Sequence, residues 1–583
     1  MAGSKKQRKA AARSGSAAVM PPPAARQAWW PWALAIVVVI VAVFEIYGPA
    51  LNGPFLLDDT YLPYDAPTPS GGLRNWIAGV RPLLMFSYWL NYRSAGAQDT
   101  YGYHAVNVVL HLLNGGLVWF IVRRLLSRFE QDRWRLNALS GFAALLFLVH
   151  PLNTESVSYV ASRSETLSVF FFYLAFALFL YRRREAIGWG RAAIILVVFG
   201  AAVLTKEHAV VLAALLLLTD YWWNPPFSSE GIRRNWRLYA PMLAAAALGG
   251  FWVARVLARA TTAGFHVTGL TWYGYFFTEC RAIWVYLLLY VLPLGQNIDH
   301  EFAVSNGLLD HGAIIGLVAL LAAIAAAWVL RRRFPLAAYG LLVFLLLLAP
   351  TSSFVPIADP LVERRLYLPF IGLLFITIDL VRRWRASRQV LAGVLGAVLV
   401  VEGALAYQRN QLWGDDIAMW RDSVSKSPNK LRPRFQLAGA LYMHGQCTEA
   451  AEEYSRAASL GKPGYNLLLD WGLAEDCAHH PDVALERIRQ ALTVEQSAHG
   501  YTQLAKVYGD AGRFDEALAA LDQAAKYDPN YDIIYFYRGT VFAKEHNFPA
   551  AIAEYRHGLA LNPQNTAIRE ALAQVEQAAS GRR

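Results

Sequence analysis

The stretch WWPWALAIVVVIVAVFEIYGPALNGPFLLDDT, residues 29–60, places a long apolar run directly before two adjacent acidic residues. The apolar part is close to the ~20 residues that a helix needs to cross a bilayer. It has no small-residue cleavage site before Glu45, so we interpret it as an uncleaved first membrane span. Adjacent carboxylates repel each other and are costly in a low dielectric, so Asp58 and Asp59 require an explanation.

The rest of the chain predicts a membrane protein with a soluble C-terminal part. With 583 residues, 56% hydrophobic and only 17% charged, it is too long for one globular core and too apolar to be wholly soluble. Apolar runs of roughly 16 to 22 residues recur as far as about Tyr407. After that point the sequence is polar.

The Lys and Arg residues indicate topology rather than a surface for nucleic acid, although the formal net charge is +11. They fall in short clusters between apolar runs, whereas the intervening loops are nearly free of them. By the positive-inside rule, the clusters are cytoplasmic and the loop with the two aspartates faces outward. The clusters are residues 1–28, 123–135, 182–191, 224–237, 331–333 and 382–388.

The same rule predicts eleven membrane crossings. Arg237 and Arg331 must lie on one side, yet three apolar stretches separate them, so one stretch does not cross. The middle one, residues 273–293, contains Glu279 and Arg281 and many Tyr and Trp residues, which suits an interfacial or re-entrant helix. Eleven crossings leave the C-terminal region on the side of the aspartates.

A repeat of 34 residues predicts an α-solenoid at the C-terminal end. The segment GRFDEALAALDQAAKYDPN from Gly512 realigns with HNFPAAIAEYRHGLALNPQ from His546. This is the tetratricopeptide (TPR) period, with small residues where paired helices touch. Such repeats bind peptides or proteins, or serve only as a scaffold. We predict a cytoplasmic tail at residues 1–28, a transmembrane domain at 29–407, a linker at 408–431 and about four repeats at 432–583.

The three cysteines have different predicted roles. Cys280 lies in an apolar helix and is expected to be a packing residue. Cys447 and Cys477 occupy neighbouring repeats. They are expected either to form a disulfide, if the region is extracytoplasmic, or to be small buried hydrophobic residues.

Many of the remaining polar residues share one depth, at the outer edge of the predicted spans. Ionisable groups at that depth are costly, so a cluster of them indicates a site. Beside the two aspartates, the members are Arg81, His104, Asn107, His111, His150, Thr154, Glu155, Arg163, Glu165, Lys206, Glu207, Glu363, Arg364, Arg365 and Tyr367.

Two histidines of this cluster lie on one helix face. His104, Asn107 and His111 follow the spacing i, i+3, i+7. Hydrogen bonding between helices explains them as well as a functional role does. A metal site is the weaker interpretation, because a spacing of two turns is too long for adjacent ligands, and we expect no metal or other cofactor.

The basic members suit the phosphate of a lipid-linked sugar. Arg163, Lys206, Arg364 and Arg365 are the candidates, and ion pairs with the neighbouring acids Glu165, Glu207 and Glu363 are the alternative. Transfer of a sugar to a hydroxyl needs a carboxylate to accept the proton or orient the acceptor, while cations stabilise the departing phosphate. A close pair of acids raises one pKa, which suits a base; helix capping or solvation is the alternative.

The motifs resemble the transmembrane and tetratricopeptide repeat-containing (TMTC) O-mannosyltransferase-like proteins, relatives of the protein O-mannosyltransferases in the GT-C glycosyltransferase superfamily. The resemblance runs in order through most of the chain, and HPLNTE with ERRLYLP is its most specific part. The matching strings are FLLDDT, RPLLMFSYWLNY, GYHAVNVVLH, HPLNTESVSYVASRSETL, LTKEHAVVL, VERRLYLP and QRNQLWGDDIAMW.

The resemblance implies about eleven spans, repeats outside the cytosol, and a polyprenyl- or dolichyl-phosphate-linked sugar, usually mannose, as the donor for Ser or Thr hydroxyls. Asp58 and Asp59 match the first and second acidic residues of the family motif. We assign Asp58 as general base and Asp59 as the residue that orients the acceptor. The Pro- and Gly-rich segment TYLPYDAPTPSGG and the small number of repeats depart from the family.

Together these patterns predict an all-α fold, with a polytopic GT-C-type transmembrane domain followed by an extracytoplasmic TPR solenoid. The predicted function is transfer of a sugar from a polyprenyl-phosphate donor to extracytoplasmic proteins held by the repeats. The alternatives are a non-catalytic membrane scaffold, or a GT-C transferase that acts on a glycan or lipid. The expected location is a bacterial inner membrane with periplasmic repeats, or an endoplasmic-reticulum membrane with lumenal repeats.

Overall fold

The computed structural model describes residues 30–61, 72–96, 99–258 and 263–580. Within these ranges the secondary structure is helical, apart from one isolated β-bridge between Ala263 and Ile357, which confirms the all-α class. The predicted basic tail and most of the Pro- and Gly-rich segment lie outside the described residues. The chain divides into two compact units, residues 1–42 and 43–583. In the first unit, the described part of helix α1 (Trp30–Tyr47) is almost wholly apolar, and most of its side chains are exposed.

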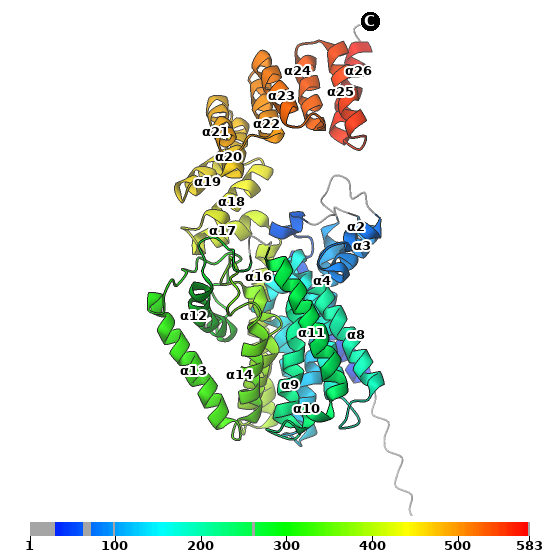
Figure 1. Cartoon of the computed structure of the whole chain (residues 1–583), viewed down its shortest axis with the longest axis vertical. Helices are drawn as coiled ribbons and strands as arrows, with labels where there is room; N and C mark the ends of the chain where they lie inside the picture. Colours follow the sequence, from blue (N-terminus) through cyan, green and yellow to red (C-terminus); the bar gives the residue numbers. More distant parts are fainter. Residues whose placement is uncertain (1–29, 62–71, 97–98, 259–262, 581–583) are drawn as a thin grey trace, which may run out of the picture. The chain divides into compact units, whose positions relative to one another are not determined.

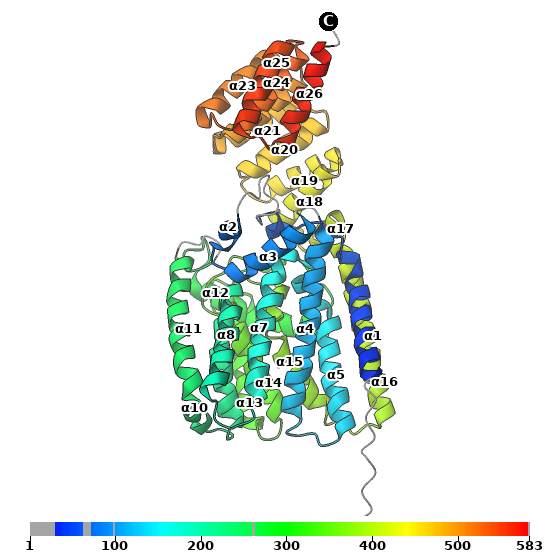
Figure 2. The same ribbon diagram turned by 90° about the vertical axis from the view of Figure 1, so that its right-hand side faces the viewer.

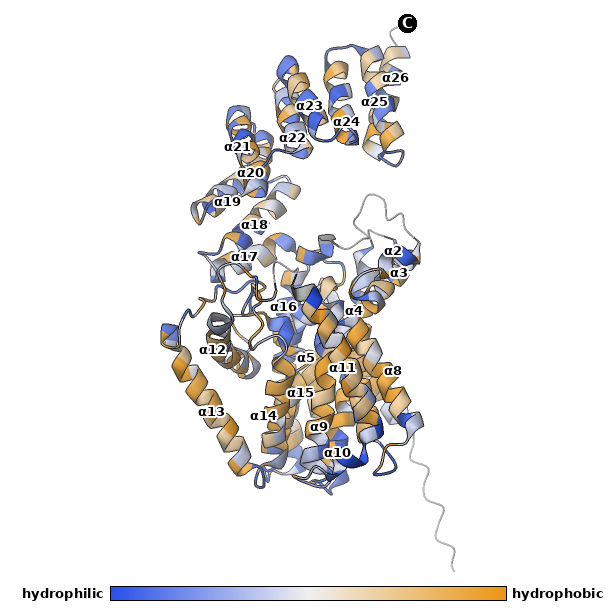
Figure 3. Cartoon of the chain, viewed as in Figure 1, coloured by the Kyte–Doolittle hydropathy of each residue, from blue (hydrophilic) through white to orange (hydrophobic). Residues whose placement is uncertain are grey.

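Several helices are long and apolar enough to cross a membrane, so the chain is a membrane protein. By length and composition six helical segments qualify, and a bent pair makes up to seven among the described residues. The apolar helices are orange in Figure 3. The segments are Trp30–Ala50, α4 (Thr100–Leu126), Val160–Leu180 with α7 (Arg163–Leu180), Trp236–Arg255 in α11 (Trp236–Leu257), Asp310–Leu330 with α13 (Ala313–Leu330), and α16 (Arg388–Trp413).

Three further apolar helices are shorter, so the count of eleven spans stays a prediction. They are α8 (Trp189–Thr205), α14 (Pro335–Leu348) and α15 (Phe370–Val381). At 1.5 Å per residue they are roughly 18 to 26 Å long, less than the ~30 Å hydrocarbon core. α14 and α15 approach closely, because a Cβ on Gly340 would lie 2.5 Å from the carbonyl oxygen of Gly372. Only glycine permits this contact.

The bent pair carries the chain to the edge of the bundle. α5 (Arg133–Val149) ends before His150, and Pro151 begins a 3-10 helix, η4 (Pro151–Asn153), which α6 (Thr154–Ser158) continues. The segment Pro151–Ser158 is bent by 51° from α5. A residue before proline is disfavoured in the helical region, and His150 is extended with φ −73° and ψ 128°. The bend places the HPLNTES motif at the helix ends.

Three of the basic clusters, residues 123–135, 224–237 and 382–388, meet at one end of the bundle. Arg135 donates to the carbonyl oxygens of Arg382 and Trp384, and Arg128 donates to the Asn224 side chain. Figure 2 shows α10 (Glu230–Arg234) at this end, opposite α2 (Leu73–Ile77) and α3 (Pro82–Ala95). Neighbouring basic clusters therefore form one layer, as a shared side of the membrane requires.

The stretch predicted not to cross forms α12 (Trp272–Val291), which is not among the candidate spans although its neighbours α11 and α13 are. Figure 1 shows α12 nearly end-on, whereas α13 and α14 are seen from the side. This arrangement agrees with an interfacial or re-entrant helix.

The C-terminal region is a stack of paired helices. The alanines at the 33- to 34-residue spacing, Ala450, Ala484, Ala517 and Ala551, are fully buried, as expected where paired helices touch. The pairs are α18 (Leu431–Met443) with α19 (Cys447–Ser459), α20 (Tyr465–Cys477) with α21 (Pro481–Val494), α22 (Ala498–Asp510) with α23 (Phe514–Tyr527), and α24 (Asp532–Lys544) with α25 (Phe548–Leu561), followed by α26 (Thr566–Ser580).

Two details refine the expected layout of this region. The predicted linker is largely helical, because α16 runs to Trp413 and α17 (Asp416–Lys426) follows two residues later. Asp415 caps α17 by accepting a hydrogen bond from the Ala418 N–H. Cys447 and Cys477 form a disulfide, with their Cα atoms 5.6 Å apart, whereas Cys280 is free and buried.

Candidate active site

The two adjacent aspartates have different environments. Asp58 is exposed, whereas Asp59 is buried within the 3-10 helix η2 (Leu57–Tyr61). The Asp59 carboxylate accepts hydrogen bonds from the backbone N–H of Leu56 at 3.1 Å and of Ala161 at 2.6 Å. Asp59 therefore anchors the acidic loop to the turn after α6, whereas Asp58 is exposed.

This burial bears on the predicted roles of the pair. Burial raises the pKa of Asp59 to about 7, against the lowering effect of its backbone hydrogen bonds, and the charge of Asp58 is only a small further cause. The acid with the raised pKa is thus Asp59. Its buried carboxylate holds the Asp58 loop, and its role in orienting an acceptor stays a prediction.

Tyr159 joins the acidic loop to the cationic part of the site. Its hydroxyl oxygen accepts a hydrogen bond from the Asp58 N–H at 2.8 Å. The guanidinium carbon of Arg364 lies 5.7 Å from the centre of the Tyr159 ring, a distance at which a cation and an aromatic face attract each other. Sequence reasoning did not single out Tyr159, although it stands inside the HPLNTESVSYVASRSETL motif.

Arg364 is the most accessible of the three predicted phosphate-binding arginines. Its Nη1 donates to Oε1 of Glu155 at 2.5 Å, and its backbone N–H donates to Oε2 at 2.9 Å. The side chain is 28% exposed, whereas Glu155 is buried. A buried carboxylate thus fixes Arg364 from one side and leaves the guanidinium partly open to solvent.

Arg163 is enclosed by protein groups, and its phosphate contact stays a prediction. Its side chain is fully buried, and its nitrogens donate to Asn107 Oδ1 at 2.9 Å and to the carbonyl oxygens of Tyr103 at 2.8 Å and Ser87 at 3.3 Å. The guanidinium also lies 4.5 Å from the ring centre of Tyr88. Arg163 therefore holds α3 and α4 together.

Arg365 is likewise enclosed by protein groups, and its phosphate contact also stays a prediction. It donates to the carbonyl oxygens of Asp359 at 2.5 Å and Pro360 at 2.9 Å, and to the Tyr275 hydroxyl at 3.2 Å. Its Nη1 lies 3.6 Å from Glu279, and the side chain is only 7% exposed. Glu279 of α12 thus contacts the ERR motif.

Two other cations are partly open on neighbouring elements. Arg81 forms a bidentate pair with Glu207, with both N···O distances 2.9 Å, and is 39% exposed. Lys206 pairs with Glu165 and is 16% exposed. His208 Nε2 lies 3.7 Å from the same Glu165. Sequence reasoning passed over His208, although it belongs to the LTKEH motif.

The alternative interpretation expected each cation to pair with an acid next to it in the sequence. The ion pairs do not follow this pattern. Instead Lys206 pairs with Glu165 of α7, and Arg364 pairs with Glu155 of α6. The elements that meet at this end are distant in the sequence, so the pairs cross between them. Three cation–carboxylate pairs therefore converge from separate elements around one end of the bundle.

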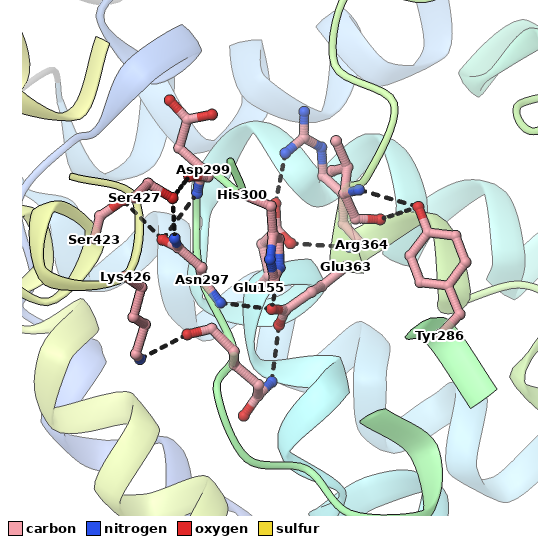
Figure 4. Close-up of polar contacts among 12 residues, drawn as sticks. Glu155, Tyr286, Asn297, Asp299, His300, Glu363, Arg364, Ser423, Lys426 and Ser427 are labelled. Carbon is pink, nitrogen blue, oxygen red and sulfur yellow. Dashed lines mark hydrogen bonds and ion pairs between the residues drawn. The ribbon is translucent and has the colours of Figure 1, made fainter. Parts of the chain in front are cut away.

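Glu363, the first residue of the ERR motif, is held by several hydrogen bonds (Figure 4). Its Oε1 accepts hydrogen bonds from the Asn297 N–H at 2.7 Å and from His300 Nε2 at 2.8 Å, and its Oε2 accepts from Gln296 at 2.9 Å. Asn297 in turn donates to the Ser427 hydroxyl at 2.8 Å, directly after α17. The network ties the residue before Arg364 to the base of the solenoid.

The histidine-bearing face of α4 packs against neighbouring segments. Asn107 donates to the carbonyl oxygens of Val157 at 3.1 Å and Tyr159 at 3.3 Å. His111 bonds to the Tyr367 hydroxyl at 2.9 Å. His104 is buried and has no hydrogen-bond partner among the described residues. For Asn107, His111 and Tyr367 these contacts favour hydrogen bonding between helices over a direct role.

His150 and Thr154 also have structural contacts. His150 Nε2 lies 3.0 Å from the carbonyl oxygen of Tyr290, and Nδ1 accepts from the Leu152 N–H at 3.2 Å. The Thr154 hydroxyl donates to the Pro151 carbonyl oxygen at 2.7 Å. Both residues shape the bend that brings Glu155 to Arg364.

Comparison with known proteins gives a family model and curated relatives. A tetratricopeptide repeat model matches residues 502–566. The protein O-mannosyl-transferase TMTC1 of Mus musculus is 32% identical over 148 residues, which is 22% of this chain and 15% of the relative. Tmtc3 of Drosophila melanogaster is 38% identical over 109 residues, covering 16% of this chain and 12% of the relative.

The human protein O-mannosyl-transferase TMTC4 is 29% identical over 184 residues, 27% of this chain and 24% of the relative. The chain is therefore similar to the TMTC family, which confirms the resemblance inferred from the motifs. The matches span less than a quarter of these relatives' lengths. Their activity is accordingly a hypothesis for this chain.

Proposed function

We propose that this chain, a relative of the TMTC protein O-mannosyl-transferases, is itself a GT-C-type glycosyltransferase of the membrane. It moves a sugar, with mannose the expected one, from a polyprenyl-phosphate donor to a Ser or Thr hydroxyl of an extracytoplasmic protein. The observation that carries the proposal is the exposed Asp58, whose backbone N–H bonds to the Tyr159 hydroxyl, while the ring of the same tyrosine faces the partly open guanidinium of Arg364.

The proposed step is a displacement at the anomeric carbon of the sugar. The Asp58 carboxylate accepts the proton of the acceptor hydroxyl, whose oxygen forms a bond to that carbon. The bond from the carbon to the phosphate oxygen breaks, and the phosphate leaves with the bonding electrons. Arg364, with Lys206 and Arg81, stabilises the charge that develops on the leaving phosphate.

The paired state of these cations fits this task. Each one has a carboxylate partner, so the empty site carries little net charge, and each retains exposed surface toward a ligand. The proposed transfer uses no metal ion. Because the cations lie at the helix ends, the polyprenyl chain of the donor can stay among the apolar helices.

The solenoid is proposed to bind the acceptor protein, since TPR repeats present a groove to peptides and the matched relatives are named as protein O-mannosyl-transferases. The disulfide between Cys447 and Cys477 supports an oxidising compartment for the repeats. The layer of basic clusters supports a cytoplasmic location for the opposite end. A bacterial inner membrane with periplasmic repeats, or an endoplasmic-reticulum membrane with lumenal repeats, satisfies both.

The test is intact-mass analysis of extracytoplasmic proteins from cells with the wild-type chain or the Asp58→Asn variant. Hexose-sized additions that appear with the wild type and fall at least 100-fold with the variant are expected, since a general base contributes roughly 10²–10⁴-fold. Asp310→Asn is the matched control, because Asp310 is also exposed and precedes α13. Equal modification by wild type and Asp58→Asn would favour a non-catalytic scaffold.

A further inference from the structure

A polar cavity lies at the basic end of the bundle, away from the acidic loop. It has a volume of about 600 Å³. α4 connects the two ends, since Tyr103 near its start contacts Arg163 while Arg124 and Arg128 lie at its far end. Its 27 residues correspond to a length of roughly 40 Å. The cavity is lined by Arg124, Arg128, Arg182, Arg183, Arg184 and Arg234.

The wall of this basic cavity is held by a buried carboxylate. Asp220 of α9 (Leu212–Trp223) is fully buried, and its Oδ1 accepts from Arg182 at 2.8 Å and from the Asn224 side chain at 2.9 Å. Its Oδ2 accepts from Asn235 at 2.6 Å and from the Tyr239 hydroxyl at 2.7 Å. Asp220 thus joins Arg182, which follows α7, to Asn224 and Asn235 in the connection between α9 and α11.

A close backbone contact fixes the same wall. A Cβ on Gly231 would lie 2.1 Å from the carbonyl oxygen of Asn224, so α10 packs directly on the end of α9. Arg128 donates to the Trp223 carbonyl oxygen and to Asn224 Oδ1, both at 3.3 Å, and lies over the Trp223 ring. The basic cavity is therefore built from defined contacts between elements, not from loose surface side chains.

The charges of the basic cavity are not balanced by protein groups. Six arginines and two glutamates, Glu185 and Glu230, line it, and Asp220 holds Arg182, which leaves an excess of three positive charges. Glu185 pairs with Arg234 at 2.6 Å and is otherwise mostly exposed. Within the described part of the chain, no carboxylate lies at ion-pair distance from the other lining arginines except Asp220, which holds Arg182.

Like charges at this spacing repel one another. Burial lowers the pKa of Arg128, and the charges of Arg124 and Arg182 lower it further. Arg124 uses its Nε for the Leu180 carbonyl oxygen at 3.1 Å, which leaves its terminal nitrogens for another acceptor. An anion in the cavity would relieve this repulsion and accept several charge-assisted hydrogen bonds.

We propose that the basic cavity binds the phosphate of an anionic phospholipid headgroup. Arginine forks match phosphate oxygens, and three uncompensated positive charges around one cavity favour an anion there. The lipid source is favoured by apolar side chains beside the cavity: Phe120 and Tyr181 are exposed next to Arg124, which lies over the Tyr181 ring. Acyl chains can lie along these rings while the headgroup enters the cavity.

The test measures lipid binding to the full chain purified in a neutral detergent. Native mass spectrometry with phosphatidylglycerol and phosphatidylcholine of equal acyl length gives the two affinities. We expect at least a tenfold preference for phosphatidylglycerol in the wild type. The paired variant Arg124→Gln, Arg128→Gln should reduce that preference at least tenfold, whereas Arg124→Lys, Arg128→Lys should retain most of it because the charges remain.

The matched control is the paired variant Arg332→Gln, Arg385→Gln. Both residues are exposed, belong to the basic clusters and lie outside the cavity, so the loss of charge is the same. Equal loss of binding in the control and cavity variants, or equal affinity of the wild type for both lipids, would overturn the proposal. Binding of glycerol 3-phosphate without a preference between the lipids would overturn the lipid source in favour of a soluble phosphate. If the Gln pair does not fold, the wild-type preference and the Lys pair still decide the outcome.

Discussion

The hydroxyl oxygen of Tyr159 accepts a hydrogen bond from the backbone N–H of Asp58 at 2.8 Å. This contact joins residues 101 positions apart, the exposed acid of the first loop and the turn that follows α6. Because the same tyrosine ring faces Arg364, one side chain sets the position of the proposed base relative to a proposed phosphate-binding cation.

Replacement of Tyr159 by Phe should therefore slow transfer without preventing folding. The variant loses the acceptor for the Asp58 N–H but keeps the ring against Arg364, so we expect kcat to fall about tenfold with little change in the donor KM. A neutral hydrogen bond contributes roughly 0.5–1.5 kcal/mol, which bounds the loss of stability.

Tyr181→Phe is the control for this experiment, since the Tyr181 hydroxyl also makes one hydrogen bond, to the Phe120 carbonyl oxygen, but at the basic end. Kinetics of sugar transfer with a purified donor and an acceptor peptide give both constants. Wild-type kcat in Tyr159→Phe would show that the loop does not need this contact.

Replacement of Arg364 by Lys should mainly weaken donor binding. The lysine keeps the charge beside buried Glu155 but loses the planar group that binds both Glu155 and a phosphate oxygen. We expect the donor KM to rise about tenfold and the acceptor KM to stay the same. Arg421→Lys, on the exposed ion pair with Glu449, is the matched control. An unchanged donor KM would remove Arg364 from the phosphate site.

The helical architecture was predictable because its signals are local. Apolar runs, basic clusters and a 34-residue repeat each state a period or a length, and the fully buried Ala450 and Ala484 lie where that repeat places small residues. The charged pair in residues 273–293 indicated that α12 differs from a span. The number of spans was harder to predict from the sequence, since α14 and α15 are shorter than the bilayer core.

The site was predictable in composition but not in pairing. Depth in the membrane identified Arg163, Arg364 and Arg365 alike, since all three stand at helix ends. Which guanidinium stays open depends on contacts between distant segments, such as Arg163 with Asn107 and Arg365 with Tyr275. Likewise nothing in the DD pair indicates that Asp59 is buried and Asp58 exposed, because that difference arises from the Ala161 N–H.

The raised pKa of Asp59 predicts a pH dependence of stability. Burial raises this pKa to about 7, whereas an unfolded Asp titrates at about 3.9. The folded state therefore binds a proton more tightly, so this group stabilises the fold below about pH 4, and its contribution declines with rising pH until about pH 7. Wild-type Tm should fall across this range relative to Asp59→Asn, which does not titrate. Parallel Tm curves for the two proteins would contradict the assignment.

Replacement of Glu363 by Gln tests whether contacts with the base of the solenoid position Arg364. The buried carboxylate accepts three hydrogen bonds, from Asn297, His300 and Gln296. A glutamine has one oxygen, and its NH₂ group would face a donor, so about 1–3 kcal/mol of stability should be lost. Arg364 adjoins this residue and should lose its fixed orientation, so transfer should fall even where the variant is fully folded.

Glu453→Gln provides the control, because Glu453 is also buried and accepts from Arg434 and Arg456, but within the solenoid. Thermal unfolding in detergent gives the stability of each variant, and transfer is measured at a temperature where both are folded. We expect the donor KM to rise for Glu363→Gln and to stay at the wild-type value for Glu453→Gln. A loss of stability with unchanged donor KM would limit the Glu363 network to holding the solenoid base, independent of the phosphate site.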